Sequence, residues 1–369
     1  MAALPSIGFA CAWDRPPEGT WSHTPWNLRG ALRERTEVAD LGLTWTTLSR
    51  SALRVLGAYR RDGRWRTNWT HRPVTMALTA TKLRAAERRL KPDVTLQIGD
   101  LALLKGPFML YQDVSFDVVL ERPHLSQGRG LNPSEVQRLR DRQHEIYAKA
   151  AGVLTMSNWL AEHLVRVSGL PAERVHVVPP AANCGPEAAR SIRRETPRRR
   201  LLFVGKDFVG KGGDLVLKAL EILRREVDPQ IELTVAGPVD WPLPGPIPDG
   251  VRFLGRIPLD QVRPLYAEHD LFVMPSRFEG YGIVFVEALA HGLPCVARRD
   301  CAMPEIVRPG VNGDLVDSDD PAALAEIITR LLSDDDVYAK TEAAAEDVIS
   351  YYSWSRVADD VLRVAGTLR

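Results

Sequence analysis

The chain has 369 residues, of which 45% are hydrophobic and 26% charged, a composition typical of a soluble globular protein with two or three domains. This composition excludes a disordered chain, a collagen-like repeat and a coiled coil. Lys and Arg number 48 and Asp and Glu 47, and the net charge of +1 predicts no nucleic-acid partner. No apolar run approaches the ~18 residues that cross a bilayer.

Neither the first residues nor the cysteines indicate secretion. The first apolar stretch, residues 7–13, is short and has no basic residue before it, unlike a signal peptide. The four cysteines contain no Cys-x-x-Cys pair, so buried thiols are favoured over a disulfide framework or a zinc site. They are Cys11, Cys184, Cys295 and Cys301. We therefore expect a cytoplasmic protein.

The first half of the chain alternates short apolar runs with helix-like segments, which predicts parallel strands joined by helices. The expected strands are residues 7–12, 94–98, 108–111, 153–156 and 175–178. Ser157 is expected to cap the helix after the fourth of them. A helix-like segment at residues 79–91 carries five Lys and Arg residues. We expect a solvated face there, with peripheral membrane contact as the alternative.

The second half of the chain repeats this pattern after a polar, basic stretch at residues 185–200. That stretch is predicted to be a solvated connector, with a lipid or nucleic-acid patch as the alternative for its arginines. The expected strands are residues 201–204, 231–236, 251–254, 271–274 and 295–297, with helices that include 214–225 and 321–332. The sequence therefore predicts two doubly wound α/β domains with parallel sheets facing an interdomain cleft, where ligands bind at the strand ends.

The loop and helix after the first strand carry aromatic side chains. Thr24 is predicted to cap this helix, with Pro25 at its first position. Trp21 and Trp26 are candidates for stacking on an acceptor ring, and packing of the loop onto its own domain is the alternative. His23 is a candidate contact for phosphate or acceptor, or an incidental loop histidine.

A glycine-rich turn, GKDFVGKGGD from residue 205 to 214, joins a predicted strand to a predicted helix. Its backbone amides and the helix N-terminus favour a phosphate, and Lys206 and Lys211 add two cations. The P-loop spacing fails because Gly212 stands where Ser or Thr would hold magnesium. A tight turn with solvated lysines explains this segment equally well when it is taken alone.

Two glutamates flank the start of a helix predicted at residues 283–290. Glu279 lies in a turn with Gly280 and Gly282, and glycine lets a ligand approach the backbone. Carboxylates accept hydrogen bonds from paired hydroxyls and helix amides favour an anion, so the segment suits a nucleotide sugar. Glu287 has apolar neighbours and is expected to be half buried. The alternative for Glu279 is an acidic residue favoured near a helix start, and the alternative for Glu287 is a solvated helix residue.

Together these segments resemble the retaining glycosyltransferases of family four, which have the GT-B fold. The resemblance rests on FVGK at residues 203–206, KGG at 211–213 and the block from 274 to 316. That block contains PSRFEGYGIVFVEALAHGLPCVA, PEIV and GVNGDLV, with the family's Glu-x7-Glu signature. The N-terminal half matches more loosely, through MSNWLAEHL and VHVVPPAAN.

The resemblance implies a role for each residue of these segments. Glu287 would bind the ribose hydroxyls and Glu279 the donor sugar. Lys206 and Lys211, beside Gly205, would neutralise the leaving diphosphate, although the family often has Arg at the first lysine. Backbone amides would meet the sugar and phosphate, and they are those of Gly280, Tyr281, Gly282, Ile283 and Val284.

Two features depart from the family pattern. Residues 300–303 replace the small residues that often precede PEIV, which puts the shape of the donor-sugar pocket in doubt. Many members have a catalytic-site histidine in the N-terminal domain, whereas here Asp113 follows the strand at residues 108–111. By resemblance to one branch of the family, we take Asp113 as the polar group nearest the reaction, with a loop-capping aspartate as the alternative.

The resemblance also implies a domain plan. Residues 1–185 would form the acceptor-side domain, completed by a C-terminal helix at about 350–369 that crosses back onto it. Residues 186–200 would be the linker and residues 201–349 the domain that binds the nucleotide sugar.

The function expected from these residues is transfer of a sugar from a nucleoside diphosphate sugar to an acceptor hydroxyl with retention at the anomeric carbon. The acceptor is a glycan, a lipid-linked glycan or a small metabolite. We expect no cofactor and no essential metal, because Asp317 and Asp319 look like an Asp-x-Asp metal motif but Asp319 or Asp320 is expected to cap the helix that starts at Pro321. The alternatives are a nucleotide-sugar binding or accessory protein and a two-domain nucleotide-sugar epimerase.

Overall fold

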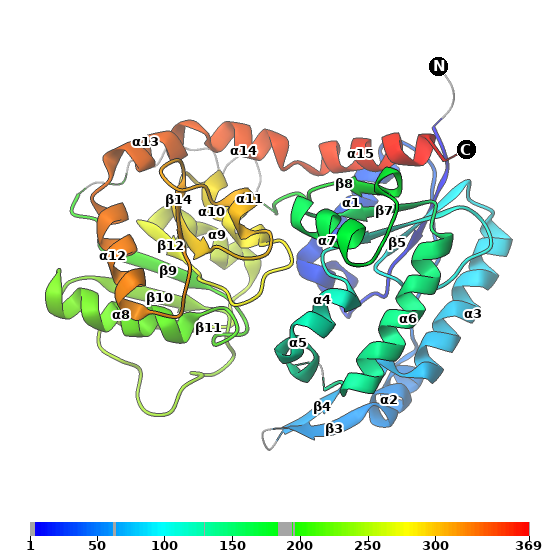
Figure 1. The fold of residues 1–369 in the computed structure, drawn as a ribbon, viewed down its shortest axis with the longest axis horizontal. Helices are drawn as coiled ribbons and strands as arrows, with labels where there is room; N and C mark the ends of the chain where they lie inside the picture. Colours follow the sequence, from blue (N-terminus) through cyan, green and yellow to red (C-terminus); the bar gives the residue numbers. More distant parts are fainter. Residues whose placement is uncertain (1–3, 62–63, 129, 184–193, 195, 369) are drawn as a thin grey trace. The chain divides into compact units, whose positions relative to one another are not determined.

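The computed structural model describes residues 4–61, 64–128, 130–183, 194 and 196–368. The chain divides into two compact units, which Figure 1 draws. Unit 1 comprises Met1–Pro180 and Trp354–Arg369, and unit 2 comprises Ala181–Ser353. Most of the expected linker, and Cys184, lie outside the described residues. The other three cysteines are buried free thiols, as expected.

Unit 1 is built on a six-stranded parallel sheet with the order β2-β1-β5-β6-β7-β8. The strands are β1 (Ile7–Ala10), β2 (Val38–Asp40), β5 (Val94–Ile98), β6 (Phe108–Gln112), β7 (Gly152–Thr155) and β8 (Val175–Val177). Every residue of the four strands β1, β5, β6 and β7 is buried, as expected for strands covered on both faces. The order reverses between β1 and β5, so the loops after these two strands flank the place where such sheets bind ligands.

Helices cover this sheet and one of them comes from the end of the chain. They are α1 (Thr24–Arg33), α2 (Thr47–Leu56), α3 (Pro73–Leu90), α4 (Phe116–Glu121), α5 (Pro123–Gly128), α6 (Pro133–Lys149), α7 (Asn158–Arg166) and α15 (Trp354–Gly366). Segments of 3-10 helix occur at Pro17–His23, which is kinked at residues 20–22, and as single turns at Trp69–His71 and Ala172–Arg174. The Oγ of Ser157 accepts a hydrogen bond from the amide of Leu160 and caps α7, which confirms that prediction.

The last helix of unit 1, α15, follows all of unit 2 in the chain and packs against α1. Val357, Val361 and Leu362 lie on its buried stripe, which has the spacing of one helix face. Arg35, just after α1, donates a hydrogen bond to Asp359 on α15. The stripe and this ion pair hold the two helices together.

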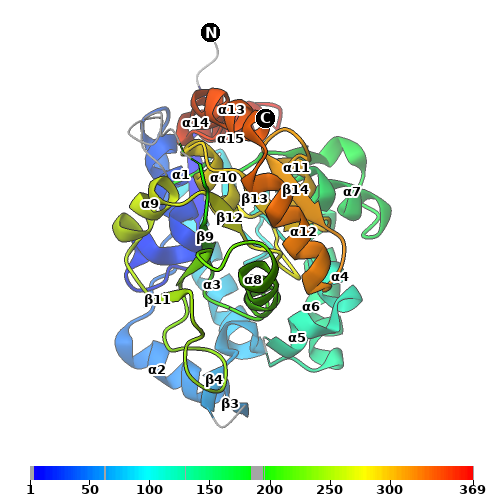
Figure 2. The ribbon, with the colours of Figure 1, turned by 90° about the vertical axis from the view of Figure 1, so that its left-hand side faces the viewer.

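Unit 2 repeats the architecture with a second six-stranded parallel sheet, in the order β11-β10-β9-β12-β13-β14. Its strands are β9 (Arg200–Val204), β10 (Glu232–Ala236), β11 (Val251–Gly255), β12 (Leu271–Val273), β13 (Cys295–Arg298) and β14 (Gly313–Val316). Its helices are α8 (Gly213–Glu226), α9 (Leu259–Glu268), α10 (Ile283–Ala290), α11 (Met303–Ile306), α12 (Pro321–Leu332), α13 (Asp335–Ala343) and α14 (Ala345–Tyr351). Helices α8 and α12 lie side by side (Figure 2). The two sheets confirm the predicted pair of doubly wound α/β domains.

Four strands were not predicted from the sequence. The edge strands β2 and β14 are short, and β3 (Ala58–Arg61) pairs with β4 (Arg64–Thr67) in a separate antiparallel hairpin. The sequence between β3 and β4 is Asp62-Gly63, a dipeptide typical of hairpin turns, and that signal was missed. In the described part of the chain, no helix is both long and apolar enough to cross a bilayer.

Residues 185–200 were predicted to be a solvated connector, and this prediction is wrong for Arg194 and Arg198, which are buried in unit 2. The guanidinium of Arg194, which is 7% exposed, donates to carbonyl oxygens at the ends of α9 and α10. Its acceptors are Tyr266, His269, His291 and Gly292, at 2.8–3.0 Å. Arg198 is also buried and lies 3.8 Å from the ring of Tyr338. The last carbonyls of a helix lack intrahelical donors, and Arg194 supplies donors to two helices at once.

Candidate functional site

Two loops meet at the point where the strand order of the unit 2 sheet reverses. Strands β9 and β12 are neighbours, with Leu201 opposite Leu271. The loop at residues 205–212 and the loop at residues 274–282 therefore leave the same edge of the sheet. In open α/β sheets this edge, beside the strand-order reversal, is where ligands bind.

Gly212 is where the two loops touch. Its φ is +79°, and a Cβ at this position would lie 2.4 Å from the carbonyl oxygen of Pro275. Only glycine combines this backbone conformation with so close an approach. Gly212 therefore breaks the P-loop pattern for a structural reason, because it brings the loop after β9 against the loop after β12.

This contact brings Lys211 and Glu279 together. The Nζ of Lys211 lies 2.6 Å from Oε2 of Glu279 and 3.3 Å from the carbonyl oxygen of Phe278. Both side chains are partly exposed, so the ion pair adds little to the stability of the fold. It does place a cation and a carboxylate side by side, and these groups suit a phosphate and a sugar hydroxyl, respectively.

Arg277 binds the two loops to each other and to α8. Its guanidinium donates to both carboxylate oxygens of Asp214, at 2.7 and 3.0 Å. Its backbone amide donates to the carbonyl oxygen of Gly210 at 3.0 Å. The hydrogen bonds with Asp214 are the main reason that the pKa of Arg277 is raised above its usual value. Arg277 thus stays charged and holds the loops in register.

The first turn of α10 supplies backbone amides beside this pair. Gly282 precedes the helix with a φ of +101°, and a Cβ there would lie 2.7 Å from the ring of Phe285 and 3.1 Å from Cγ of Glu279. The first amides of a helix have no intrahelical acceptor and carry positive potential. Those of Ile283 and Val284 are therefore placed to bind an anion.

The carboxylate of Glu287 is buried inside unit 2 and only 6% exposed, more than the half burial expected. It accepts hydrogen bonds from the hydroxyl of Tyr266 at 3.1 Å and from Nδ2 of Asn183 at 3.4 Å. Burial raises the pKa of Glu287, and these hydrogen bonds partly offset the effect. Arg263 donates to the carbonyl oxygen of Asn183 at 2.6 Å and so fixes this partner in turn. Neither Asn183 nor Tyr266 was singled out from the sequence.

The remaining donor-side candidates differ in exposure. Lys206 is exposed, and the amide of Gly205 donates to the carbonyl oxygen of Ala236 at 2.9 Å. The side chain of Tyr281 is buried, with its hydroxyl 3.2 Å from that of Tyr352. Tyr281 therefore packs within unit 2 and offers a ligand its backbone. Gly280 is buried in the same turn.

Asp317 and Asp319 form ion pairs with arginines. Asp317 accepts from Arg299 at 2.8 Å, and Asp319 accepts from Arg277 at 2.9 Å and from Arg298. The cap of α12 is Asp320, as one of the two expectations had it. Within the described ranges, no group of three His, Cys, Asp or Glu side chains is arranged to hold a metal ion.

In unit 1, Asp113 lies directly after β6 and is half buried. It is placed at the carboxyl edge of the sheet, one strand away from the reversal between β1 and β5. Ser115 caps α4, which begins two residues after Val114. The cap and the start of this helix fix the segment that carries Asp113.

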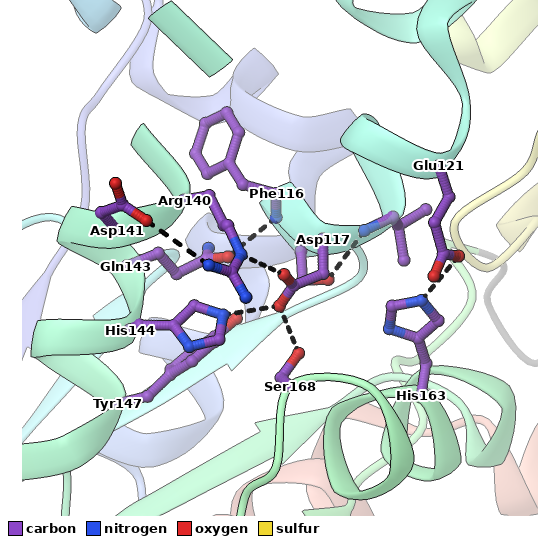
Figure 3. Close-up of polar contacts among 12 residues, drawn as sticks. Phe116, Asp117, Glu121, Arg140, Asp141, Gln143, His144, Tyr147, His163 and Ser168 are labelled. Atoms are coloured by element: carbon purple, nitrogen blue, oxygen red, sulfur yellow. Dashed lines mark hydrogen bonds and ion pairs between the residues drawn. The ribbon is translucent and has the colours of Figure 1, made fainter. Parts of the chain in front are cut away.

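A second polar cluster, which the sequence did not predict, anchors α4 (Figure 3). Asp117 on α4 is 4% exposed and accepts hydrogen bonds from Arg140 at 2.6 Å, His144 at 2.7 Å and Ser168 at 2.5 Å. Burial alone would raise the pKa of Asp117, but these bonds outweigh burial and lower it. Ser168 and His144 both point at the carboxylate, so the cluster joins α4, α6 and the segment after α7 rather than activating a serine.

The acceptor-side candidates lie at the strand-order reversal of the unit 1 sheet. A Cβ on Gly99, directly after β5, would lie 3.9 Å from the indole of Trp21, which is 43% exposed. His23 is half buried and takes the N-cap position of α1 with a φ of +70°. Thr24 is the first residue of α1, so the predicted cap is wrong by one residue. Trp26 packs against the guanidinium of Arg29, 4.4 Å from its ring, which favours the packing alternative for that residue.

A protein-family model matches most of unit 2. Residues 198–334 match the family model described as "Glycosyl transferases group 1". The match includes both loops at the strand-order reversal and all of α10. This segment of unit 2 is therefore similar to glycosyl transferases of group 1.

Curated relatives resemble part of the chain. The D-inositol 3-phosphate glycosyltransferase of Xylanimonas cellulosilytica is 30% identical over 251 residues, which are 60% of this chain and 58% of the relative. The D-inositol 3-phosphate glycosyltransferase 1 of Catenulispora acidiphila is 32% identical over 228 residues, 55% of this chain and 54% of the relative. The chain thus spans little more than half the length of the curated relatives it matches.

Solved structures resemble the whole chain in fold. Sucrose-phosphate synthase from Thermosynechococcus elongatus has a TM-score of 0.71 at 17% identity, covering 99% of both chains. Anabaena HepE, solved in complex with UDP and glucose, has a TM-score of 0.64 at 16% identity, covering 99% of this chain and 100% of the other. The chain therefore has the GT-B fold, as the sequence resemblance implied.

Proposed function

We propose that this protein transfers a sugar from a nucleoside diphosphate sugar to an acceptor hydroxyl, with retention of configuration at the anomeric carbon. The observation that carries the proposal is the contact between Lys211 and Glu279 at the strand-order reversal of the unit 2 sheet. It puts a phosphate-binding cation beside a sugar-binding carboxylate, and a nucleotide sugar needs both. The HepE structure, solved with UDP and glucose, supports this class of donor.

Each donor-side residue then has a role. Lys206, Lys211 and the first amides of α10 bind the diphosphate. Glu279 accepts hydrogen bonds from hydroxyls of the donor sugar, and Glu287 from those of the ribose. Each oxygen of a carboxylate has two lone pairs, so Glu287 can bind a ribose hydroxyl while it keeps Tyr266 and Asn183 as partners.

The reaction breaks the bond between the anomeric carbon and the β-phosphate oxygen and forms a bond from that carbon to the acceptor oxygen. The acceptor proton passes to the departing phosphate oxygen, so no protein nucleophile is required. The leaving diphosphate gains negative charge, which the two lysines and the helix amides stabilise without reorganisation. These groups take the place of a metal ion, and Asp113 serves as the polar group on the acceptor side.

The proposal is tested by offering the protein UDP-, GDP-, ADP- and TDP-sugars with a panel of hydroxyl acceptors. The names of the curated relatives make D-inositol 3-phosphate one compound to include. We expect one diphosphate to raise the melting temperature, and the product to have the donor's anomeric configuration by NMR. Inversion of configuration would exclude the retaining mechanism. An unchanged melting temperature with every diphosphate would exclude the donor site itself.

A further inference from the structure

A projecting part of unit 1 has a surface that the proposed function does not use. Helix α2 and the β3–β4 hairpin follow one another in the chain, and Figures 1 and 2 both place them at the end of unit 1 away from α15. The hydroxyl of Thr67 at the end of the hairpin donates to the carbonyl oxygen of Arg54 on α2, at 3.0 Å. We call the described residues of this part, 47–61 and 64–67, the α2–hairpin surface.

This surface exposes large apolar side chains. Leu48 is 84% exposed and Trp65 75%, and Val55 and Leu56 are exposed as well. Leu48 and Val55 stand seven residues apart, on one stripe of α2, whereas Leu53 on another face is buried. Soluble proteins seldom leave several large apolar side chains together in water, so the stripe marks an interaction surface.

The same surface is strongly basic. Residues 47–67 contain six arginines and one acidic residue, Asp62, so their formal net charge is +5, while that of the whole chain is +1. Arg54, Arg60 and Arg66 are exposed. Arg60 stands directly opposite Trp65 in the hairpin, so these two side chains leave the same face.

We infer that the α2–hairpin surface binds the face of a membrane that contains anionic lipids. Arginines would bind lipid phosphates, the indole of Trp65 would lie at the level of the head groups, and the aliphatic stripe of α2 would enter the acyl boundary. With ten residues, α2 is about 15 Å long and lies along the interface rather than across the bilayer. A nucleic acid would use the arginines but has no place for aliphatic side chains.

The α2–hairpin surface is not the basic segment at residues 79–91, for which the sequence left peripheral membrane contact as an alternative. On α3, Lys82 donates to the carbonyl oxygen of Thr44 and lies 4.3 Å from the ring of Trp45. Arg84 donates to the carbonyl oxygen of Leu103. Two of the five cations at residues 79–91 therefore contact other parts of unit 1 and stabilise its fold. The α2–hairpin surface, in contrast, combines positive charge with exposed apolar side chains.

The inference does not depend on the proposed reaction, because binding is measured without donor or acceptor. The full chain is sedimented with vesicles of phosphatidylcholine alone and with vesicles of equal parts phosphatidylcholine and phosphatidylglycerol. We expect sedimentation with the mixed vesicles at low salt, weakened by added salt. Equal recovery with both vesicles, or none with either, would overturn the inference.

Variants locate the contact. Arg54→Gln with Arg60→Gln removes two exposed cations and should lower partitioning about 25-fold, since each contributes about a factor of five near an anionic surface. Leu48→Ser with Val55→Ser should lower it by at least tenfold. The matched controls are Arg88→Gln with Arg89→Gln on α3, and Val227→Ser with Val239→Ser in unit 2, all at exposed positions. They should bind as the unaltered protein does.

Other occupants of the surface give different results. If a second copy covers it, light scattering should show a dimer that Leu48→Ser with Val55→Ser converts to a monomer, and lipid binding should be absent. If it binds nucleic acid, a single-stranded DNA probe should bind to the unaltered protein but not to Arg54→Gln with Arg60→Gln, and vesicles should not compete. Either result, or equal loss of vesicle binding in the controls, would overturn the inference.

Discussion

The Nζ of Lys211 and Oε2 of Glu279 are 2.6 Å apart, although the two residues are 68 positions apart in the chain. They meet because β9 and β12 are adjacent where the strand order reverses. In the proposed reaction a diphosphate competes with Glu279 for the ammonium group, which leaves the carboxylate free for a sugar hydroxyl. The pair therefore holds both groups that the proposed donor requires at one place.

Replacing Lys211 tests this role. Lys211→Ala should lower turnover about 100- to 1000-fold, because one group that stabilises developing charge is lost. The melting temperature should change little, since the ion pair is partly exposed. Lys218→Ala removes an exposed lysine from α8 and is the matched control. Steady-state kinetics would refute the assignment if the two variants had equal turnover.

Gly212 allows the loops to touch, and a methyl group there should separate them. Gly212→Ala is expected to weaken diphosphate binding and lower the melting temperature, because its Cβ would meet Pro275 at 2.4 Å. Gly245→Ala is the control, since Gly245 also has a positive φ but open space around it. Calorimetric titration of both variants with the diphosphate distinguishes the effect of the clash with Pro275 from that of strain in a backbone with a positive φ. Similar binding losses in the two would show that contact with Pro275 is unimportant.

Glu287→Gln should separate stability from binding. Burial raises the pKa of Glu287 in the folded protein. Above this raised pKa, the ionised carboxylate therefore lowers the free energy of unfolding. This loss disappears as the pH falls below the usual pKa of glutamate, because the carboxyl group is then protonated in both the folded and the unfolded chain. At pH 7 the neutral variant should therefore unfold at the same or a higher urea concentration than the unaltered protein. Its donor affinity should fall, because a carboxylate that accepts ribose hydroxyls is lost. A destabilised variant would indicate that the carboxylate serves the fold.

Asp117→Asn should destabilise unit 1 by about 2 kcal/mol at pH 7, because hydrogen bonds to a buried charge are lost. Because the pKa of Asp117 is lowered in the folded protein, its carboxylate stabilises the fold at pH values above the usual pKa of aspartate. This stabilisation is lost as the pH falls through the pKa that Asp117 has in the folded protein. Urea unfolding should therefore show a large difference between the variant and the unaltered protein at pH 7 and a smaller one in acid. Asp141→Asn, at an exposed contact of Arg140, is the control. A difference that stays constant with pH would contradict this account.

Local patterns in the sequence were enough to predict the parts of the site that depend on neighbours in the chain. The apolar run around Glu287 indicated burial, and the glycines around Lys211 and Glu279 indicated turns at strand ends. The strand-helix alternation indicated both sheets and hence the edge at which these residues meet.

Contacts between distant segments could not be predicted in this way. Arg194 lies in a polar, basic stretch, and nothing in that stretch shows that its guanidinium serves carbonyl groups of two helices far along the chain. Asn183 and Tyr266 converge on Glu287 from different segments for the same reason. Thr24 illustrates a smaller error, since cap positions inferred from residue type are uncertain by a residue or two.

The path of α15 has a consequence for biosynthesis. The ribosome makes residues 354–366 after all of unit 2, yet their apolar stripe belongs against α1. Unit 1 is therefore completed only after the centre of the chain has been made, and until then the flank of α1 that contacts α15 is uncovered. The usual order of co-translational folding is reversed, because the part made first is the last to be completed.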